Sequence, residues 1–210
     1  MGTNTTSAIH RTTLLGGALL AVAGLIALLG SARVTLPDSA IPFGSIIPAT
    51  IADIVLLAAF ITLAVGVRGE TGIVGTSTVG RVALILFGCG YLLFGLFSLL
   101  PLSPGSGAAL AAGIVLQVLI VAAGLVAGVI ALRAGVVNGA ARWILLAVVV
   151  GNALWSIPAF IPDAALALSL AVWKAELVMP VGFVILGVSL AVHGRSAAIR
   201  HRLHAINENW

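Results

Sequence analysis

Apolar residues run along the chain in six long stretches that short connectors separate. Within each stretch the apolar residues are continuous, without the alternation of polar and apolar positions that a barrel strand shows. A helix needs about 20 mostly apolar residues to cross a bilayer. The stretches cover residues 13–32, 47–67, 82–100, 108–132, 143–161 and 164–192. The pattern therefore predicts an all-α membrane protein with six transmembrane helices.

The composition excludes an ordinary soluble domain. Hydrophobic residues make up 61% of the 210 residues and charged residues only 8%, against about 25% charged residues in soluble proteins. The basic residues are spread singly, so no stripe of positive charge predicts a nucleic-acid partner. Because Cys89 is the only cysteine, an internal disulfide or a cysteine metal cluster cannot form.

The first apolar stretch has an alternative interpretation as a signal peptide. His10 and Arg11 precede it, and Gly30-Ser31-Ala32 could form a cleavage site. Cleavage would leave five helices. The run is long for a signal sequence, which favours a retained transmembrane helix.

Arginines in the connectors predict the orientation, because cytoplasmic loops are rich in basic residues. With the N-terminus inside, Arg33 is the only basic residue in an outer connector. The inner segments hold Arg11, Arg68, Arg81, Arg133, Arg142, Arg195, Arg200 and Arg202. This bias predicts a protein of the cell membrane with both ends in the cytoplasm. Residues 1–12 would form a cytoplasmic N-terminus, and residues 13–193 the transmembrane domain.

Residues 194–210 predict a basic amphipathic tail. Ile199, Leu203, Ile206 and Trp210 recur at helical spacing, and the arginines and histidines lie mostly on other faces. Such a helix would rest on the anionic lipids of the inner leaflet. The alternative is a frayed, soluble tail.

An internal repeat relates the third and fifth stretches. A shift of 61 residues aligns Arg81 with Arg142 and Gly90 with Gly151, and it also aligns Pro101 with Pro162. A shift of 59 residues relates the fourth and sixth stretches in the same way. The pattern predicts three tandem helical hairpins at about 13–67, 82–132 and 143–193. Chance similarity between apolar helices is the alternative.

The repeat resembles the short-repeat membrane family that includes the acid-resistance membrane protein HdeD. The matching residues follow the family's order of a basic residue, a glycine-bearing helix, a proline at the turn and a final basic residue. The turns here read Leu-Pro-Leu and Ile-Pro-Asp, where the family usually has Trp-Pro-Gly or Pro-Gly. The resemblance covers about residues 81–195 and implies three helical hairpins and a stress-related role. The matching residues are Arg81, Gly90, Pro101 and Arg133, then Arg142, Gly151, Pro162 and Arg195.

Polar residues inside the apolar stretches are the candidate functional residues. Counted at about 1.5 Å per residue from the inner arginines, Asp53, Gln117, Lys174 and Glu176 fall in the outer part of the bilayer. They could form an interfacial belt, in which Lys174 extends to the headgroups beside Trp173. Alternatively, they could form an outward-facing pocket in which Lys174 pairs with Asp53.

Tyr91 and Asn152 each follow a repeat glycine and fall near the middle of the membrane. A hydrogen bond between them across two helices is plausible from their depth. We expect a packing role for both residues rather than a substrate contact.

The polar residues predict no catalytic site. All four histidines fall on the cytoplasmic side and the membrane carboxylates on the outer side, so a histidine-carboxylate pair is unlikely. No phosphate-binding loop or metal motif occurs, so no cofactor is expected. We expect a non-enzymatic multi-pass protein that acts through helix packing or contacts with partners, including a second copy. The alternative is a small transporter or channel subunit that uses the outer polar cluster.

The orientation can be tested with reporter fusions. Because the connector at Gly105 should lie outside and the connector at Asn138 inside, a periplasm-active reporter should report only at Gly105. A cytoplasm-active reporter should report only at Asn138. The reverse result would contradict the predicted topology.

Overall fold

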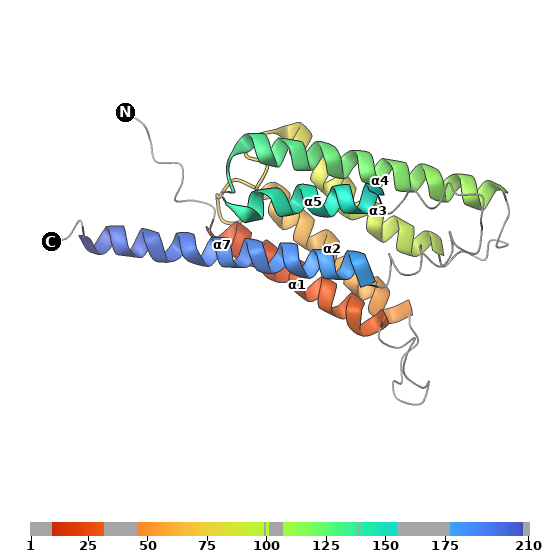
Figure 1. Ribbon diagram of the computed structural model, residues 1–210, viewed down its shortest axis with the longest axis horizontal. Coiled ribbons are helices and arrows are strands. Elements are labelled where there is room, and N and C mark those ends of the chain that lie inside the picture. The colour runs from red at the N-terminus through yellow and green to blue at the C-terminus, as the bar shows by residue number, and fades with distance from the viewer. Residues whose placement is uncertain are drawn as a thin grey trace.

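The computed structural model describes residues 10–31, 46–98, 100, 107–137, 139–154 and 177–207. All named elements in these ranges are helices (Figure 1). The helices are α1 (His10–Ser31), α2 (Ile46–Val65), α3 (Thr78–Ser98), α4 (Gly107–Ala134), α5 (Ala140–Leu154) and α7 (Met179–Asn207).

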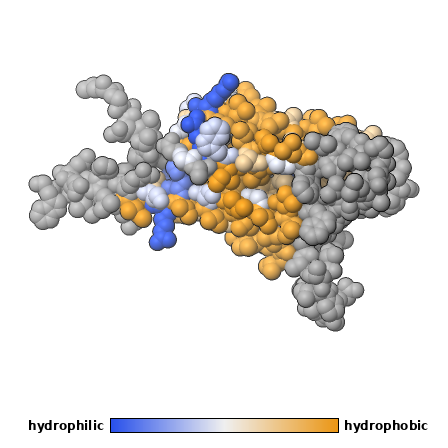
Figure 2. Space-filling view, in the orientation of Figure 1, coloured by the Kyte–Doolittle hydropathy of each residue, from blue (hydrophilic) through white to orange (hydrophobic). Residues whose placement is uncertain are grey.

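Five of these helices are long and apolar enough to cross a membrane, and α5 is shorter. Large apolar side chains are exposed on every helix, and Leu29 of α1 is 70% exposed. On the face drawn in Figure 2, apolar residues cover most of the described surface, and hydrophilic residues gather where α1 begins and α4 ends. Water is a poor solvent for such a surface, so this is a membrane-embedded protein. The sixth span and the orientation stay predictions.

The helices form a closed cycle of neighbours, which we call the helix ring. Each helix packs against the next one along the described chain, and α7 packs against α1. Figure 1 shows α1 and α7 running side by side. Aromatic side chains join the elements across the interior of the ring. Phe60 of α2 lies edge-on to Phe87 of α3, with their ring centroids 5.1 Å apart, and to Phe183 of α7, 6.1 Å away.

Glycines bring the backbones of α1 and α7 into direct contact. A methyl group on Gly17 would lie 2.6 Å from the Ala191 nitrogen, and one on Gly187 would overlap the backbone of Ala21. The contact continues along the same face of both helices, because a methyl group on Gly24 of α1 would lie 2.6 Å from the carbonyl oxygen of Pro180 of α7. Small residues that let helices approach closely are typical of helix packing in lipid.

Helix α7 covers the second half of the predicted last span and most of the predicted tail. The predicted span began at residue 164, and residues 155–176 lie outside the described part of the chain. Pro180 is the second residue of α7, and residues 177–178 directly before it form a π-helical turn. Residues 194–207 continue α7 without a break, and the contact of residues 194–210 with inner-leaflet lipids stays a prediction.

The two glycines that the repeat aligns have different surroundings. A methyl group on Gly90 would overlap the side chain of Ile120, so this glycine is needed for the packing of α3 on α4. A methyl group on Gly151 would meet no described atom within 4 Å. The three-hairpin repeat stays a prediction.

The α1–α7 contact can be tested with two glycine variants of α7. Gly187→Ala should lower the free energy of unfolding by about 1–3 kcal/mol, because the added methyl must push two backbones apart. Gly182→Ala is the matched control, since its methyl would lie 3.5 Å from Val148 in ordinary contact. Thermal unfolding in detergent measures both. Equal midpoints for the two variants would contradict the tight α1–α7 contact.

Candidate functional site

Asp53 is a carboxylate within the apolar helix α2 and is half-buried. Its Oδ2 atom lies against Gly95 of α3, where any larger residue would overlap it. Tyr91 stands one helical turn before Gly95 on the same helix. The carboxylate is therefore directed at the neighbouring helix rather than outward into lipid.

Gln117 and Asn152 join α4 to α5. The Gln117 Nε2 atom donates a hydrogen bond to Asn152 Oδ1 over 3.4 Å, and Asn152 is only 1% exposed. The sequence placed Gln117 in the outer cluster and Asn152 deeper with Tyr91, so this pairing was not anticipated.

Tyr91 is a packing residue in the interior of the ring. Its ring lies edge-on to Phe87 at 5.3 Å and to Phe183 at 5.2 Å. The buried hydroxyl has no hydrogen-bond partner among the described residues, so Tyr91 makes no hydrogen bond to Asn152 and has the packing role expected of it. Leaving a buried hydroxyl without a partner costs about 1–3 kcal/mol, which the aromatic contacts must offset.

Lys174 and Glu176 lie outside the described residues. The predicted pairing of Lys174 with Asp53, and the alternative interfacial belt, therefore stay predictions. Of the candidate residues that are described, Asp53 belongs to the α2–α3 contact and Gln117 to the α4–α5 contact.

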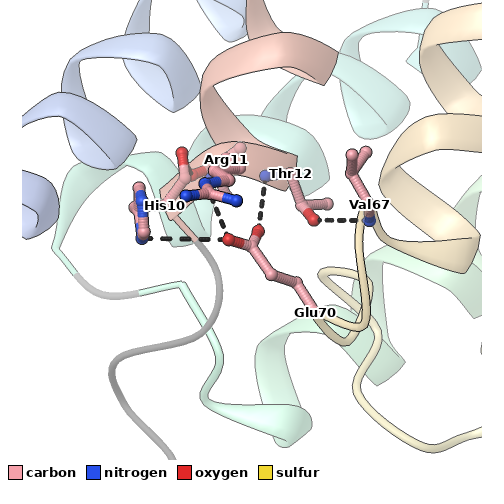
Figure 3. A network of polar contacts seen from close by, with 6 residues as sticks. His10, Arg11, Thr12, Val67 and Glu70 are labelled. Atoms are coloured by element: carbon pink, nitrogen blue, oxygen red, sulfur yellow. Dashed lines mark hydrogen bonds and ion pairs between the residues drawn. The ribbon is translucent and has the colours of Figure 1, made fainter.

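A second polar site, absent from the sequence interpretation, lies at the other end of the helices. Figure 3 shows Glu70 directed at the first turn of α1. Its carboxylate accepts hydrogen bonds from the backbone nitrogens of Arg11 at 3.2 Å and Thr12 at 2.7 Å. His10 Nδ1 lies 3.8 Å from the same carboxylate. The side chain of Glu70 is only 7% exposed. Glu70 therefore caps the positive end of the α1 dipole.

The turns of the α2–α3 connector, residues 66–77, place Glu70 at the first turn of α1. Gly66 and Gly69 have φ angles of +88° and +82°, which turn the chain sharply after α2. Ile73 and Val74 are buried, and the Ile73 nitrogen donates a hydrogen bond to the Leu63 carbonyl. The connector therefore folds back and packs against the end of the helix ring. In return, Thr12 Oγ1 accepts a hydrogen bond from the Val67 nitrogen at 3.0 Å.

Sequence reasoning could have found Glu70 only in part. It is the one acidic residue in the connectors that the arginine bias assigns to the cytoplasm. A single carboxylate among basic connectors could therefore have been singled out as a candidate for a specific contact. The partner of Glu70 lies almost 60 positions away in the sequence, and no local pattern indicates such a contact.

Two other connector contacts use arginines. The Arg81 guanidinium donates to the Gly75 carbonyl over 3.2 Å, and the Arg142 guanidinium donates to the Leu132 carbonyl near the end of α4. These two arginines are the repeat-aligned pair, and both fix connectors at this end of the bundle. Because Leu132 lies in the last turn of α4, the positive charge of Arg142 also interacts favourably with the negative end of the α4 dipole.

The described residues bring together no group of three histidine, cysteine, aspartate or glutamate side chains that could hold a metal ion. The polar groups instead connect helices and cap their ends. No family model, curated protein or solved structure matches the chain.

The Glu70 cap can be tested by substitution. Glu70→Ala should lower the free energy of unfolding by about 1–2 kcal/mol, because two backbone donors in the first turn of α1 lose their acceptor. Hydrogen exchange in the first turn of α1 should speed up in the same variant. Arg68→Gln, which removes an exposed charge from the same connector, is the control. Equal unfolding midpoints and exchange rates in the two variants would contradict the cap.

Proposed function

We propose that this chain is a non-enzymatic multi-pass protein of the cell membrane that acts through contacts with its neighbours there. It would not act by moving a solute through its centre. The observation that carries the proposal is the aromatic cluster of Phe60, Phe87, Tyr91 and Phe183 inside the helix ring.

The cluster argues against a central path because it fills the space that a path would need. Phe60 and Phe87 have no exposed surface at all. A solute path through a membrane protein needs polar or water-filled lining. At the end of the ring where Glu70 caps α1, the buried residues Ile73 and Val74 of the connector add a further apolar layer. The surfaces left for function are the lipid-facing sides of the helices and the end of the helix ring near Arg81, Arg133 and Arg142, which we call the arginine-bearing end.

We include a stress-related role in the proposal. Its support is the resemblance of residues 81–195 to the family of the acid-resistance membrane protein HdeD. A protein that works by contact needs no catalytic group, which agrees with the structural use of the polar residues described above.

A small transporter is the second candidate, and Asp53 favours it. A carboxylate in a membrane helix is costly and usually marks an ion path or a proton relay. Asp53 stands beside α3 and close to the turn that carries Tyr91. Transport would require these helices to separate, because the aromatic cluster lies between them and α7.

The two functions can be separated with the full-length protein in proteoliposomes and in its own host. Wild-type protein and Asp53→Asn should both give proton and potassium fluxes equal to those of protein-free vesicles. A gene deletion should reduce survival of acid shock, and both forms should restore it equally. A wild-type flux that Asp53→Asn abolishes would favour the transporter. Full survival of the deletion strain would overturn the stress role.

A further inference from the structure

A groove of about 560 Å³ runs between α3 and α4. On α3 its lining begins at Thr78 and reaches Leu93, a length of about 22 Å along the helix. On α4 the lining extends from Leu116 to Val126. The lining is apolar almost throughout, so the groove suits a hydrocarbon chain and offers nothing to a polar solute.

Small residues deepen the groove and larger ones form its walls. Cys89 and Gly90 of α3 and Ala123 of α4 line it where the helices approach. Leu86 and Leu119 are 55% and 60% exposed and stand at its sides. In a bilayer an apolar groove that stayed empty would lose the dispersion contacts of its lining. An occupant made of hydrocarbon restores them.

Positive charge gathers at one end of this groove. Arg133 is exposed in the last turn of α4, and it lies two turns beyond Val126 on the same helical face. Arg142 reaches the carbonyl of Leu132 at this end of α4. Arg81 reaches the carbonyl of Gly75, and Gly75 lies beside Ala134.

The exposed guanidinium of Arg133 is the group that an anion can reach directly. Arg81 and Arg142 contribute positive charge beside it, since their guanidinium groups are bonded to the carbonyls of Gly75 and Leu132. The ion pair found in the described part of the chain joins His10 to Glu70, so it neutralises none of the three arginines. A phosphate satisfies guanidinium donors with two parallel hydrogen bonds.

We propose that the α3–α4 groove binds one acyl chain of an anionic phospholipid whose phosphate lies at Arg133, flanked by Arg81 and Arg142. The inference goes beyond the proposed function and needs only the membrane embedding. It differs from binding by the C-terminal residues, because α7 contributes nothing to the groove.

Charge favours a lipid over a second copy of the chain. Two copies in one membrane share an orientation, and a twofold contact through α3 and α4 would place identical surfaces together. The two arginine-bearing ends would then meet at the same level and repel each other. An anionic headgroup instead neutralises the charge.

The headgroup contact can be tested by native mass spectrometry of the full-length protein in detergent. Phosphatidylglycerol and phosphatidylcholine with the same acyl chains are the probes. Wild-type protein should retain one phosphatidylglycerol in preference to phosphatidylcholine. Arg133→Gln should weaken phosphatidylglycerol binding about fivefold, the equivalent of about 1 kcal/mol for one arginine near an anionic surface. Arg195→Gln, an exposed arginine on α7, is the control and should change little.

The acyl-chain contact needs a separate pair of variants. Ala122→Trp fills the groove and should abolish retention of the lipid, whereas Ala112→Trp adds the same side chain to an exposed position of α4 outside the groove. Equal weakening by Arg133→Gln and Arg195→Gln would show binding by overall charge and overturn the site. Retention in Ala122→Trp would also overturn it, as would a lipid-free dimer that this variant dissociates.

Discussion

The backbone contact between α1 and α7 is the interaction on which the rest of the arrangement depends. Lipid tails solvate leucine as well as a neighbouring helix does, so apolar side chains alone give membrane helices little reason to associate. Close packing at Gly17 and Gly187 supplies that reason. It closes the helix ring, and closure gives Leu20, Leu186 and Leu190 a shared buried interior. Without it the helices would form an open layer.

Polar groups in this protein serve the two halves of the structure differently. At the arginine-bearing end, Glu70, Arg81 and Arg142 bind backbone atoms, so each fixes a helix end or a connector. Within the membrane, Gln117 binds the side chain of Asn152 and joins two helices. The first kind of contact orders the connectors, and the second aligns neighbouring spans. Both satisfy groups that lipid cannot solvate.

The helices could be predicted from the sequence because their cause is local. An apolar run of sufficient length forms a helix in lipid whatever its neighbours are, so α1 to α4 match their predicted stretches within a few residues. Contacts between distant residues could not be predicted in this way. The Glu70 cap depends on how the α2–α3 connector turns, and the Gln117–Asn152 bond depends on the relative heights of α4 and α5. Lys174 and Glu176 lie outside the described residues.

Closure of the ring by α7 also sets an order for biogenesis. Among the described helices α1 leaves the ribosome first and α7 last, so the glycine face of α1 enters the membrane before its partner exists. Glu70 is synthesised much earlier than α7 and can cap α1 while the ring is still open. The nascent protein thus holds α1 by its end and against α2 first, and it covers the glycine face of α1 only after synthesis of α7. A chain stopped before α7 would present an uncovered glycine seam, which membrane quality-control proteases could recognise as incomplete.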